Sequence, residues 1–316
     1  MTVLNKQSFT SENEVRWCPG CGDYAILAAM QRFLPSTGLS PEQLVFVSGI
    51  GCAGRFPYYM NTYGFHAIHG RAPAIATGIK TMNPDLSVWL VTGDGDSLSI
   101  GTNHLVHCLR RNVDINILLL NNQVYGLTKG QSSPTSPQGL VTKTTPSGVS
   151  TPPINPMKLA LASGATFVAR GLDKDPKHLA TLFEAANNHR GTSFIEIYQN
   201  CPIFNDGAFD TYDSKKTRAQ HVVYLNNNDT ETPLQFGSAD EPHYLSREES
   251  DWQVTTNEEK RCVHHANNLE HAHRLAELPA KNLPLPLGIY YQAQRDSYSP
   301  QAKKVNVNFE ALNKLF

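Results

Sequence analysis

The sequence has no apolar run that approaches the roughly 20 residues needed to cross a lipid bilayer. It also lacks an apolar signal core at its start and any internal repeat. Its 27 basic and 28 acidic residues give a formal net charge of −1, so no excess of positive charge points to nucleic acid or to an anionic membrane. We therefore expect a cytoplasmic protein that binds neither nucleic acid nor membrane. A chain of 316 residues is long enough for one or two domains.

Polar motifs follow two strand-like runs in the first half of the chain. Gly93-Asp94-Gly95-Asp96 closes one run and Asn121-Asn122 closes the next, so that 28 positions separate Asp94 from Asn122. A divalent cation such as Mg²⁺ takes hard oxygen ligands and usually keeps phosphate among them, and glycine lets the backbone approach phosphate closely. Two ordinary strand–helix turns would also explain the pattern. Both motifs at this spacing favour a metal-bound diphosphate, and they are similar to the diphosphate-binding motif of thiamine-diphosphate enzymes.

The chain alternates strand-like and helix-like segments. Short apolar runs predict strands at 44–49, 86–92, 114–120 and 193–198, and helical apolar spacing predicts helices at 23–34, 97–111 and 177–189. This alternation is typical of an α/β fold with a doubly wound, mainly parallel sheet flanked by helices. Ligands of such sheets bind at the carboxyl ends of the strands. Because Cys52, Asp94, Asn122 and Cys201 each follow a predicted strand, we expect them at one edge of the sheet.

Two parts of the chain depart from this pattern. Residues 127–157 are rich in Gly, Pro, Ser and Thr and predict a long loop, which either covers the diphosphate, meets a partner chain or is a plain surface excursion. Beyond residue 211 the segments are polar and turn-rich, with one helix-like stretch at 257–279. We predict a functional domain over 1–210 and an irregular C-terminal extension over 211–316 that wraps this domain or a partner.

Four of the six cysteines are placed to meet at the same edge of the sheet. Cys18 and Cys21 form a C-x-x-C pair at the start of a predicted helix, and Cys52 and Cys201 follow strands. In a cytosolic chain of this size, cysteines favour metal binding or catalysis over disulfides. Four thiolates suit structural Zn²⁺ or an iron–sulfur cluster, and a redox-active pair at Cys18 and Cys21 is a further reading.

Six short motifs together resemble the β subunit of 2-oxoacid:ferredoxin oxidoreductases, over roughly residues 10–215. They are Trp17-Cys18-Pro19-Gly20-Cys21-Gly22, Gly49-Ile50-Gly51-Cys52, His69-Gly70-Arg71-Ala72, Gly93-Asp94-Gly95-Asp96, Asn121-Asn122-Gln123-Val124-Tyr125-Gly126 and Gly130-Gln131-Ser132-Ser133-Pro134-Thr135. The segments 155–160 and 164–170 are similar to the 2-oxoglutarate branch of this family.

The resemblance implies three cofactors, which are thiamine diphosphate, Mg²⁺ and one [4Fe–4S] cluster. The implied cluster ligands are Cys18, Cys21, Cys52 and Cys201, and the implied Mg²⁺ ligands are Asp94, Asn122 and the Val124 carbonyl. The implied contacts of thiamine diphosphate, besides the Mg²⁺ ligands, are Ile50, Gly51, Cys52, Ala53, His69, Gly93, Gly95, Asp96, Gly126 and Leu127. Arg55 and His69 are the expected catalytic residues; Arg55 either pairs with a substrate carboxylate or is an ordinary surface arginine.

The implied reaction is the coenzyme A-dependent oxidative decarboxylation of a 2-oxo acid, with 2-oxoglutarate as the expected substrate, and with electrons passed through the cluster to ferredoxin. Thiamine enzymes need a carboxylate against the aminopyrimidine ring. This sequence offers no convincing glutamate, and in this family the α subunit supplies it, so we expect activity only in a heterodimer with an α subunit. An alternative is a non-redox thiamine-diphosphate-dependent decarboxylase or synthase with structural zinc at the cysteines. An iron–sulfur electron carrier is disfavoured, because it needs no diphosphate site.

Overall fold

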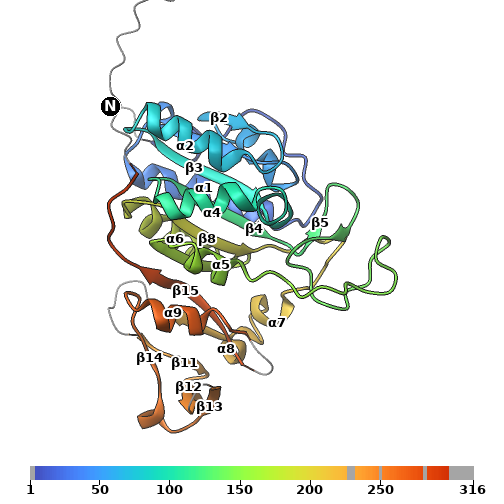
Figure 1. Ribbon diagram of the computed structural model, residues 1–316, viewed down its shortest axis with the longest axis vertical. Coiled ribbons are helices and arrows are strands. Elements are labelled where there is room, and N and C mark those ends of the chain that lie inside the picture. Colours follow the sequence, from blue (N-terminus) through green and yellow to red (C-terminus); the bar gives the residue numbers. More distant parts are fainter. Residues whose placement is uncertain (1–3, 226–231, 249–250, 280–282, 299–316) are drawn as a thin grey trace, which may run out of the picture.

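The computed structural model describes residues 4–225, 232–248, 251–279 and 283–298. Its centre is an eight-stranded sheet with the strand order β2-β1-β3-β4-β8-β7-β15-β9 (Figure 1). These strands are β1 (Leu44–Ser48), β2 (Tyr63–His66), β3 (Ser87–Gly93), β4 (Asn116–Asn121), β7 (Phe167–Leu172), β8 (Ser193–Tyr198), β9 (Val222–Leu225) and β15 (Leu285–Gln292). The first six run parallel to one another, whereas β15 runs antiparallel to β7 and parallel to β9. The prediction of a mainly parallel α/β sheet is confirmed.

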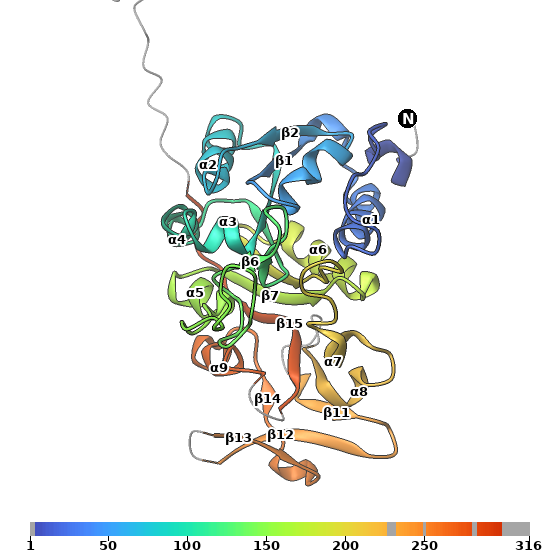
Figure 2. The ribbon, with the colours of Figure 1, turned by 90° about the vertical axis from the view of Figure 1, so that its right-hand side faces the viewer.

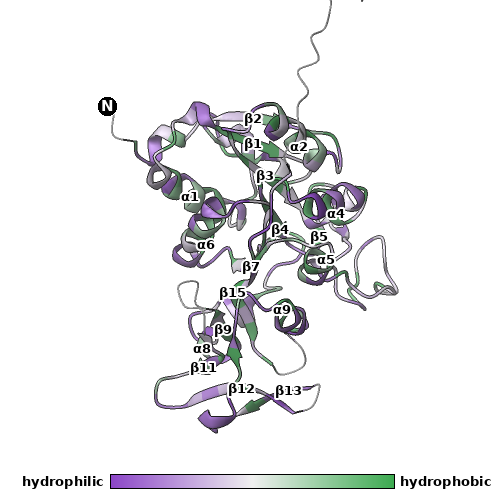
Figure 3. Ribbon diagram, turned by 60° about the vertical axis from the view of Figure 1, so that its left-hand side comes forward, coloured by the Kyte–Doolittle hydropathy of each residue, from purple (hydrophilic) through white to green (hydrophobic). Residues whose placement is uncertain are grey.

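Helices cover both faces of this sheet, because the strands alternate buried side chains between two cores. In β3, Val88 and Leu90 join one core, and Trp89 and Val91 join the other. The helices are α1 (Asp23–Phe33), α2 (Ala72–Met82), α3 (Asp94–Leu98), α4 (Thr102–Arg111), α5 (Pro156–Ala162), α6 (Pro176–Asn188), α7 (Asp210–Asp213), α8 (Arg218–His221) and α9 (Leu269–Leu275). Helices α1 and α6 pack on the Trp89 face, and α2, α4 and α5 pack on the opposite face (Figure 3).

Short 3₁₀ segments and two-residue strands complete the described part of the chain. The 3₁₀ segments are η1 (Lys6–Phe9), η2 (Leu34–Thr37), η3 (Pro41–Gln43), η4 (Ala53–Tyr59) and η5 (Glu258–Lys260). The predicted loop at 127–157 leaves the body of the molecule beside β5 (Val124–Tyr125), which pairs with β6 (Gln131–Ser132), and it ends where α5 begins (Figure 1).

The predicted helix at 97–111 is wrong at its start. Helix α3 ends at Leu98 and α4 begins only at Thr102. Between them the Gly101 amide donates to the Asp96 carbonyl at 3.1 Å. A Cβ on Gly101 would lie 2.6 Å from that carbonyl oxygen and 3.0 Å from the Gly70 Cα. The chain therefore turns here because two backbone segments approach more closely than any side chain allows.

The C-terminal part adds strands that the polar sequence pattern did not reveal. Strands β9 and β15 extend the central sheet, and β11 (Gln235–Gly237), β12 (Pro242–Glu248) and β13 (Asp251–Thr255) form a separate sheet at the far end of the molecule (Figure 2). The helix predicted at 257–279 is confined to α9, since β14 (Val263–His264) precedes it and pairs with β10 (Thr232–Pro233). The division of the chain at residue 210 stays a prediction. Within the described residues, no helix combines the length and the apolar character that crossing a membrane requires.

Candidate functional site

The carboxyl ends of β1, β3, β4 and β8 meet at one edge of the sheet, as expected for neighbouring parallel strands. A cavity of about 240 Å³ opens there. It is lined by Ile50, Gly51, Cys52, Ala53, His69, Gly93, Asp94, Asp96, Leu120, Asn122, Val124, Tyr125, Gly126, Leu127, Thr128 and Gln199. Every predicted thiamine-diphosphate contact except Gly95 belongs to this lining. The structure thus brings these residues together, while their roles as cofactor contacts stay predictions.

Gly95 lies beneath Tyr125 instead of lining the cavity. The Tyr125 hydroxyl donates to the Gly95 carbonyl at 3.1 Å, and a Cβ on Gly95 would lie 2.2 Å from Tyr125 Cε1. Glycine is needed here for the close approach of the ring, which in turn helps to form the cavity wall.

Asp94 is a buried carboxylate at the start of α3, only 2 % exposed. The Thr135 hydroxyl, from the long loop, donates to Asp94 Oδ2 at 2.6 Å. Burial raises the pKa of the Asp94 carboxyl to about 6, although hydrogen bonds from Ser133 and Thr135 act in the opposite direction. Since a buried carboxylate is costly unless it is paired or coordinates a metal, this environment suits a bound cation.

Asp96 organises two backbone turns around the cavity. Its Oδ1 accepts hydrogen bonds from the Ile50 amide at 3.2 Å and the Gly70 amide at 3.0 Å, and its Oδ2 accepts from the Thr92 hydroxyl at 3.0 Å. His69 Nδ1 lies 3.4 Å from the same Oδ1. The carboxylate is therefore largely used within the chain, where it fixes the position of the Ile50 turn and of His69.

Asn122 follows β4 and carries a fixed amide. Its Oδ1 accepts from the Val124 amide at 3.1 Å, and its Nδ2 donates to Gln199 Oε1 at 2.9 Å. Gln199 was not predicted as a site residue. Its signal in the sequence is the one that identified Asn122, namely a polar side chain directly after a strand.

A buried polar network supports the cavity from below. Asn121 Nδ2 donates to Glu196 Oε1 at 2.8 Å, and Glu196 Oε2 pairs with Arg170 Nε at 2.7 Å. Asn121 Oδ1 lies 2.9 Å from the Thr135 hydroxyl, which connects this network to Asp94. Arg170 also donates to the Leu278 carbonyl at 3.1 Å, so a hydrogen bond connects the C-terminal segment to this network.

The four predicted cluster cysteines gather beside the cavity, and all are free thiols. A Cβ on Gly126 would lie 3.6 Å from Cys52 Sγ and 3.7 Å from Cys201 Sγ. Burial, followed by the neighbouring charges of Asp23, Cys201 and Cys18, raises the pKa of Cys52 to about 12. Gln199 Nε2 lies 3.4 Å from Cys21 Sγ. Across the described residues, no group of three or more His, Cys, Asp or Glu side chains is arranged to hold a single metal ion.

Arg55 and the segments that suggested 2-oxoglutarate lie outside the cavity lining. Arg55 belongs to η4, and its Nε donates to the Tyr59 hydroxyl at 2.9 Å. Asn155 caps α5 through the Lys158 amide at 3.0 Å, and residues 167–172 form the buried strand β7. The structure therefore places these two segments in and around α5 and β7, apart from the cavity lining.

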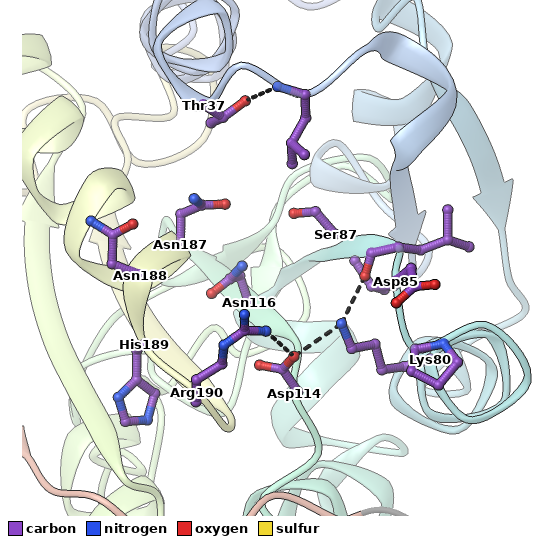
Figure 4. A pocket seen from close by; sticks show the side chains of 14 residues that line it. Thr37, Lys80, Asp85, Ser87, Asp114, Asn116, Asn187, Asn188, His189 and Arg190 are labelled. Carbon is purple, nitrogen blue, oxygen red and sulfur yellow. Dashed lines mark hydrogen bonds and ion pairs between the residues drawn. The ribbon is translucent and has the colours of Figure 1, made fainter.

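A second pocket lies at the opposite edge of the sheet, where β3 and β4 begin (Figure 4). Lys80 and Arg190 converge there on Asp114, at 2.9 and 3.6 Å, and Lys80 also donates to the Leu86 carbonyl at 2.8 Å. Both cations are therefore already paired within the chain. None of the predicted site residues lines this pocket, so the cavity at the carboxyl ends of the strands is the better candidate for chemistry.

Comparison with known proteins identifies the family. The family "Thiamine pyrophosphate enzyme, C-terminal TPP binding domain" matches residues 49–197. A 2-oxoglutarate oxidoreductase subunit KorB from Mycobacterium tuberculosis is 57 % identical over 73 % of this chain and 61 % of that protein. A 2-oxoglutarate synthase subunit KorB from Methanothermobacter thermautotrophicus is 40 % identical over 66 % of this chain and 70 % of that protein.

A solved structure supports the same assignment over the whole chain. A 2-oxoglutarate:ferredoxin oxidoreductase from Magnetococcus marinus, with 2-oxoglutarate, coenzyme A and succinyl-CoA bound, has 31 % sequence identity and a TM-score of 0.78, and the match covers 100 % of this chain and 97 % of that one. The chain spans about three-fifths of the length of some curated relatives, with 61 % for the Mycobacterium tuberculosis protein and 63 % for a 2-oxoacid:ferredoxin oxidoreductase β subunit from Saccharolobus solfataricus. The chain belongs to the family of β subunits of 2-oxoacid:ferredoxin oxidoreductases.

Proposed function

We propose that this chain is the β subunit of a 2-oxoglutarate:ferredoxin oxidoreductase. The complete enzyme would convert 2-oxoglutarate and coenzyme A to succinyl-CoA and CO₂, and would pass the electrons to ferredoxin. The observation that carries the proposal is that a candidate diphosphate site and a candidate cluster site lie next to each other. A buried Asp94–Asn122 pair lines a cavity at the strand ends, and free cysteines gather at Gly126 beside the same cavity.

The cavity fits a metal-bound thiamine diphosphate. Asp94 is buried, and no ion pair among the described residues neutralises it. Mg²⁺ would take Asp94, the Asn122 oxygen and the Val124 carbonyl, which are hard oxygen ligands of the kind it prefers. Glycines at positions 51, 93 and 126 line the cavity and leave room for phosphate and ring atoms.

The cysteine site suits an iron–sulfur cluster in this proposal. The four cysteines are free thiols, and four Cys thiolates are the usual ligands of a [4Fe–4S] cluster. Structural zinc also takes four thiolates, and the resemblance to the ferredoxin oxidoreductases favours the cluster. Gly126 leaves space beside this site, since a side chain there would touch the Cys52 and Cys201 sulfurs.

The bound cofactors would supply an electron sink for decarboxylation and a one-electron carrier. The residues of this chain position them. Asp96 fixes the Ile50 and Gly70 turns through its hydrogen bonds, and it orients His69 through Nδ1, which leaves Nε2 of His69 for the cavity. Arg55, which lies outside the cavity lining and whose Nε donates to the Tyr59 hydroxyl, would attract the substrate carboxylate. This arrangement places reacting groups before any chemical step occurs.

A partner subunit completes the site in this proposal. A relative with the same role is named a β subunit, which implies an α subunit, and the aminopyrimidine-side glutamate is expected from that chain. The test is coenzyme A-dependent reduction of ferredoxin or a viologen dye with 2-oxoglutarate. We expect turnover from the chain co-purified with its α subunit and none from either chain alone. Release of an aldehyde without dye reduction would favour the non-redox decarboxylase, and full activity of this chain alone would refute the dependence on α.

A further inference from the structure

Gln199 contacts residues of both proposed cofactor sites. It follows β8 directly, is 1 % exposed and lines the cavity. Its Oε1 accepts from Asn122 Nδ2 at 2.9 Å, and its Nε2 lies 3.4 Å from Cys21 Sγ. One buried side chain therefore joins a proposed Mg²⁺ ligand to a proposed cluster ligand.

A backbone donor fixes the orientation of both amides. The Val124 amide can only donate, and it lies 3.1 Å from Asn122, so the oxygen of Asn122 faces Val124 and its NH₂ group faces Gln199. Gln199 must then turn its oxygen to Asn122. Its NH₂ group is left for the Asn200 carbonyl and the Cys21 sulfur, which both accept hydrogen bonds. In the opposite orientation, the NH₂ group of Gln199 would face the NH₂ group of Asn122, and the oxygen of Gln199 would face the Asn200 carbonyl. The N–H of Gln199 therefore points at the Cys21 sulfur.

Packing holds the Gln199 side chain between the two sites. Its backbone amide donates to the Asn121 carbonyl at 3.0 Å. Position 22 is a glycine, and a Cβ there would lie 3.0 Å from Gln199 Cγ and 1.9 Å from Asp173 Oδ2. The helix that follows the C-x-x-C pair therefore approaches Gln199 at a point where no side chain intervenes.

We propose that Gln199 is a positioning residue that couples the diphosphate site to the cluster. This inference rests on the proposed function, because it needs both cofactors. On one side, Gln199 holds the Asn122 amide with its oxygen directed away from Gln199 and available to Mg²⁺. On the other side, its N–H stabilises the negative charge that the sulfur ligands gain on reduction. Hydrogen bonds to cluster sulfurs are one of the factors that set the reduction potential.

Gln199→Met tests the inference, because methionine keeps the length of the side chain but cannot hold Asn122 or donate to sulfur. The variant is purified anaerobically with its α subunit. The cluster midpoint potential is measured by a redox titration followed by electron paramagnetic resonance, and the Mg²⁺ dissociation constant by calorimetry with thiamine diphosphate present. Loss of one hydrogen bond to a charged acceptor lowers the equilibrium constant for one-electron reduction of the cluster roughly tenfold. The midpoint potential should therefore become about 59 mV more negative. The Mg²⁺ dissociation constant rises roughly tenfold, as for other residues that orient metal ligands.

Gln31→Met is the matched control, since Gln31 is a buried amide in α1 whose Nε2 donates to the Tyr59 carbonyl at 3.0 Å. Both readouts should equal those of the wild type in this control. A Gln199→Met sample with a full cluster and both wild-type values would overturn the inference. If Gln199→Met yields no loaded protein, Gln199→Glu decides, because it removes the N–H and adds a negative charge, and an unchanged potential overturns the inference.

Iron and sulfide analysis of the wild type distinguishes a failure of the proposed function from a failure of the inference about Gln199. A wild-type sample without sulfide contradicts the proposed function, and the inference with it. A wild-type sample with a full cluster, together with a Gln199→Met variant that keeps both the wild-type potential and the wild-type Mg²⁺ dissociation constant, contradicts the inference alone.

Discussion

Replacing Thr135 by valine removes one hydroxyl group from the proposed Mg²⁺ site and nearly preserves the shape of the side chain. The hydroxyl lies 2.6 Å from Asp94 Oδ2, and both residues are buried, at 4 % and 2 % exposed. The hydroxyl orients the carboxylate, and loss of a residue that orients a metal ligand typically costs about 10- to 100-fold in metal affinity. We therefore expect the Mg²⁺ dissociation constant of Thr135→Val to rise roughly 10- to 100-fold.

The same variant has a defined pH dependence. Burial raises the pKa of Asp94 from 3.8 to about 6, and the bond from Thr135 opposes this rise. Because Mg²⁺ competes with a proton for the carboxylate, affinity should weaken as the pH falls through about 6 in the wild type. In Thr135→Val the pKa rises further, so the weakening begins at a higher pH. The defect should therefore be larger near pH 6 than near pH 8.

Calorimetric titration of Mg²⁺ with excess thiamine diphosphate measures both effects. Thr142→Val is the matched control. It removes a hydroxyl group from the same loop, but this hydroxyl bonds to the Thr145 hydroxyl at 2.7 Å and not to Asp94. We expect wild-type affinity from this control at each pH. Equal dissociation constants for Thr135→Val and the wild type at both pH values would refute the role of Asp94 as a cation ligand supported by Thr135.

Three further predictions concern stability and the shape of the cavity. Arg170→Met leaves the buried Glu196 carboxylate without its partner at 2.7 Å, so chemical denaturation should show a loss of about 3–5 kcal/mol, and a loss below about 1 kcal/mol would contradict this. Gly49→Ala places a Cβ 1.8 Å from Asp96 Oδ2, so thiamine diphosphate should bind more weakly by calorimetry while circular dichroism stays unchanged. Burial lowers the pKa of His264 from 6.5 to about 4. The stability that the neutral His264 contributes is therefore fully present above pH 6.5 and is lost as the pH falls toward 4. In His264→Gln, the free energy of unfolding from denaturation curves should fall less steeply over this range.

The central strands and the convergence of the site could be predicted because they depend on local patterns. Strands β1, β4 and β8 are uninterrupted buried runs, and the residue after each strand faces a shared edge in any doubly wound sheet. That rule alone placed Cys52, Asp94, Asn122 and Cys201 near one another.

Strands β7 and β15 could not be predicted because tertiary contacts determine them. Strand β7 contains Arg170, which is compatible with a core only because Glu196 lies on the neighbouring strand. Strand β15 contains Pro286 and Gly288, residues that normally argue against a strand. The bridging role of Gln199 depends on distances between Asn122 and Cys21, which are far apart in the sequence.

The most direct test of the account is an iron, sulfide and zinc analysis of this chain after anaerobic co-purification with its α subunit, with absorption spectra before and after dithionite. The account predicts about four irons and four sulfides per chain, and a band near 400 nm that bleaches on reduction. One zinc per chain and no sulfide in a fully loaded sample would contradict it. The protein would then be a non-redox thiamine-diphosphate enzyme with structural zinc.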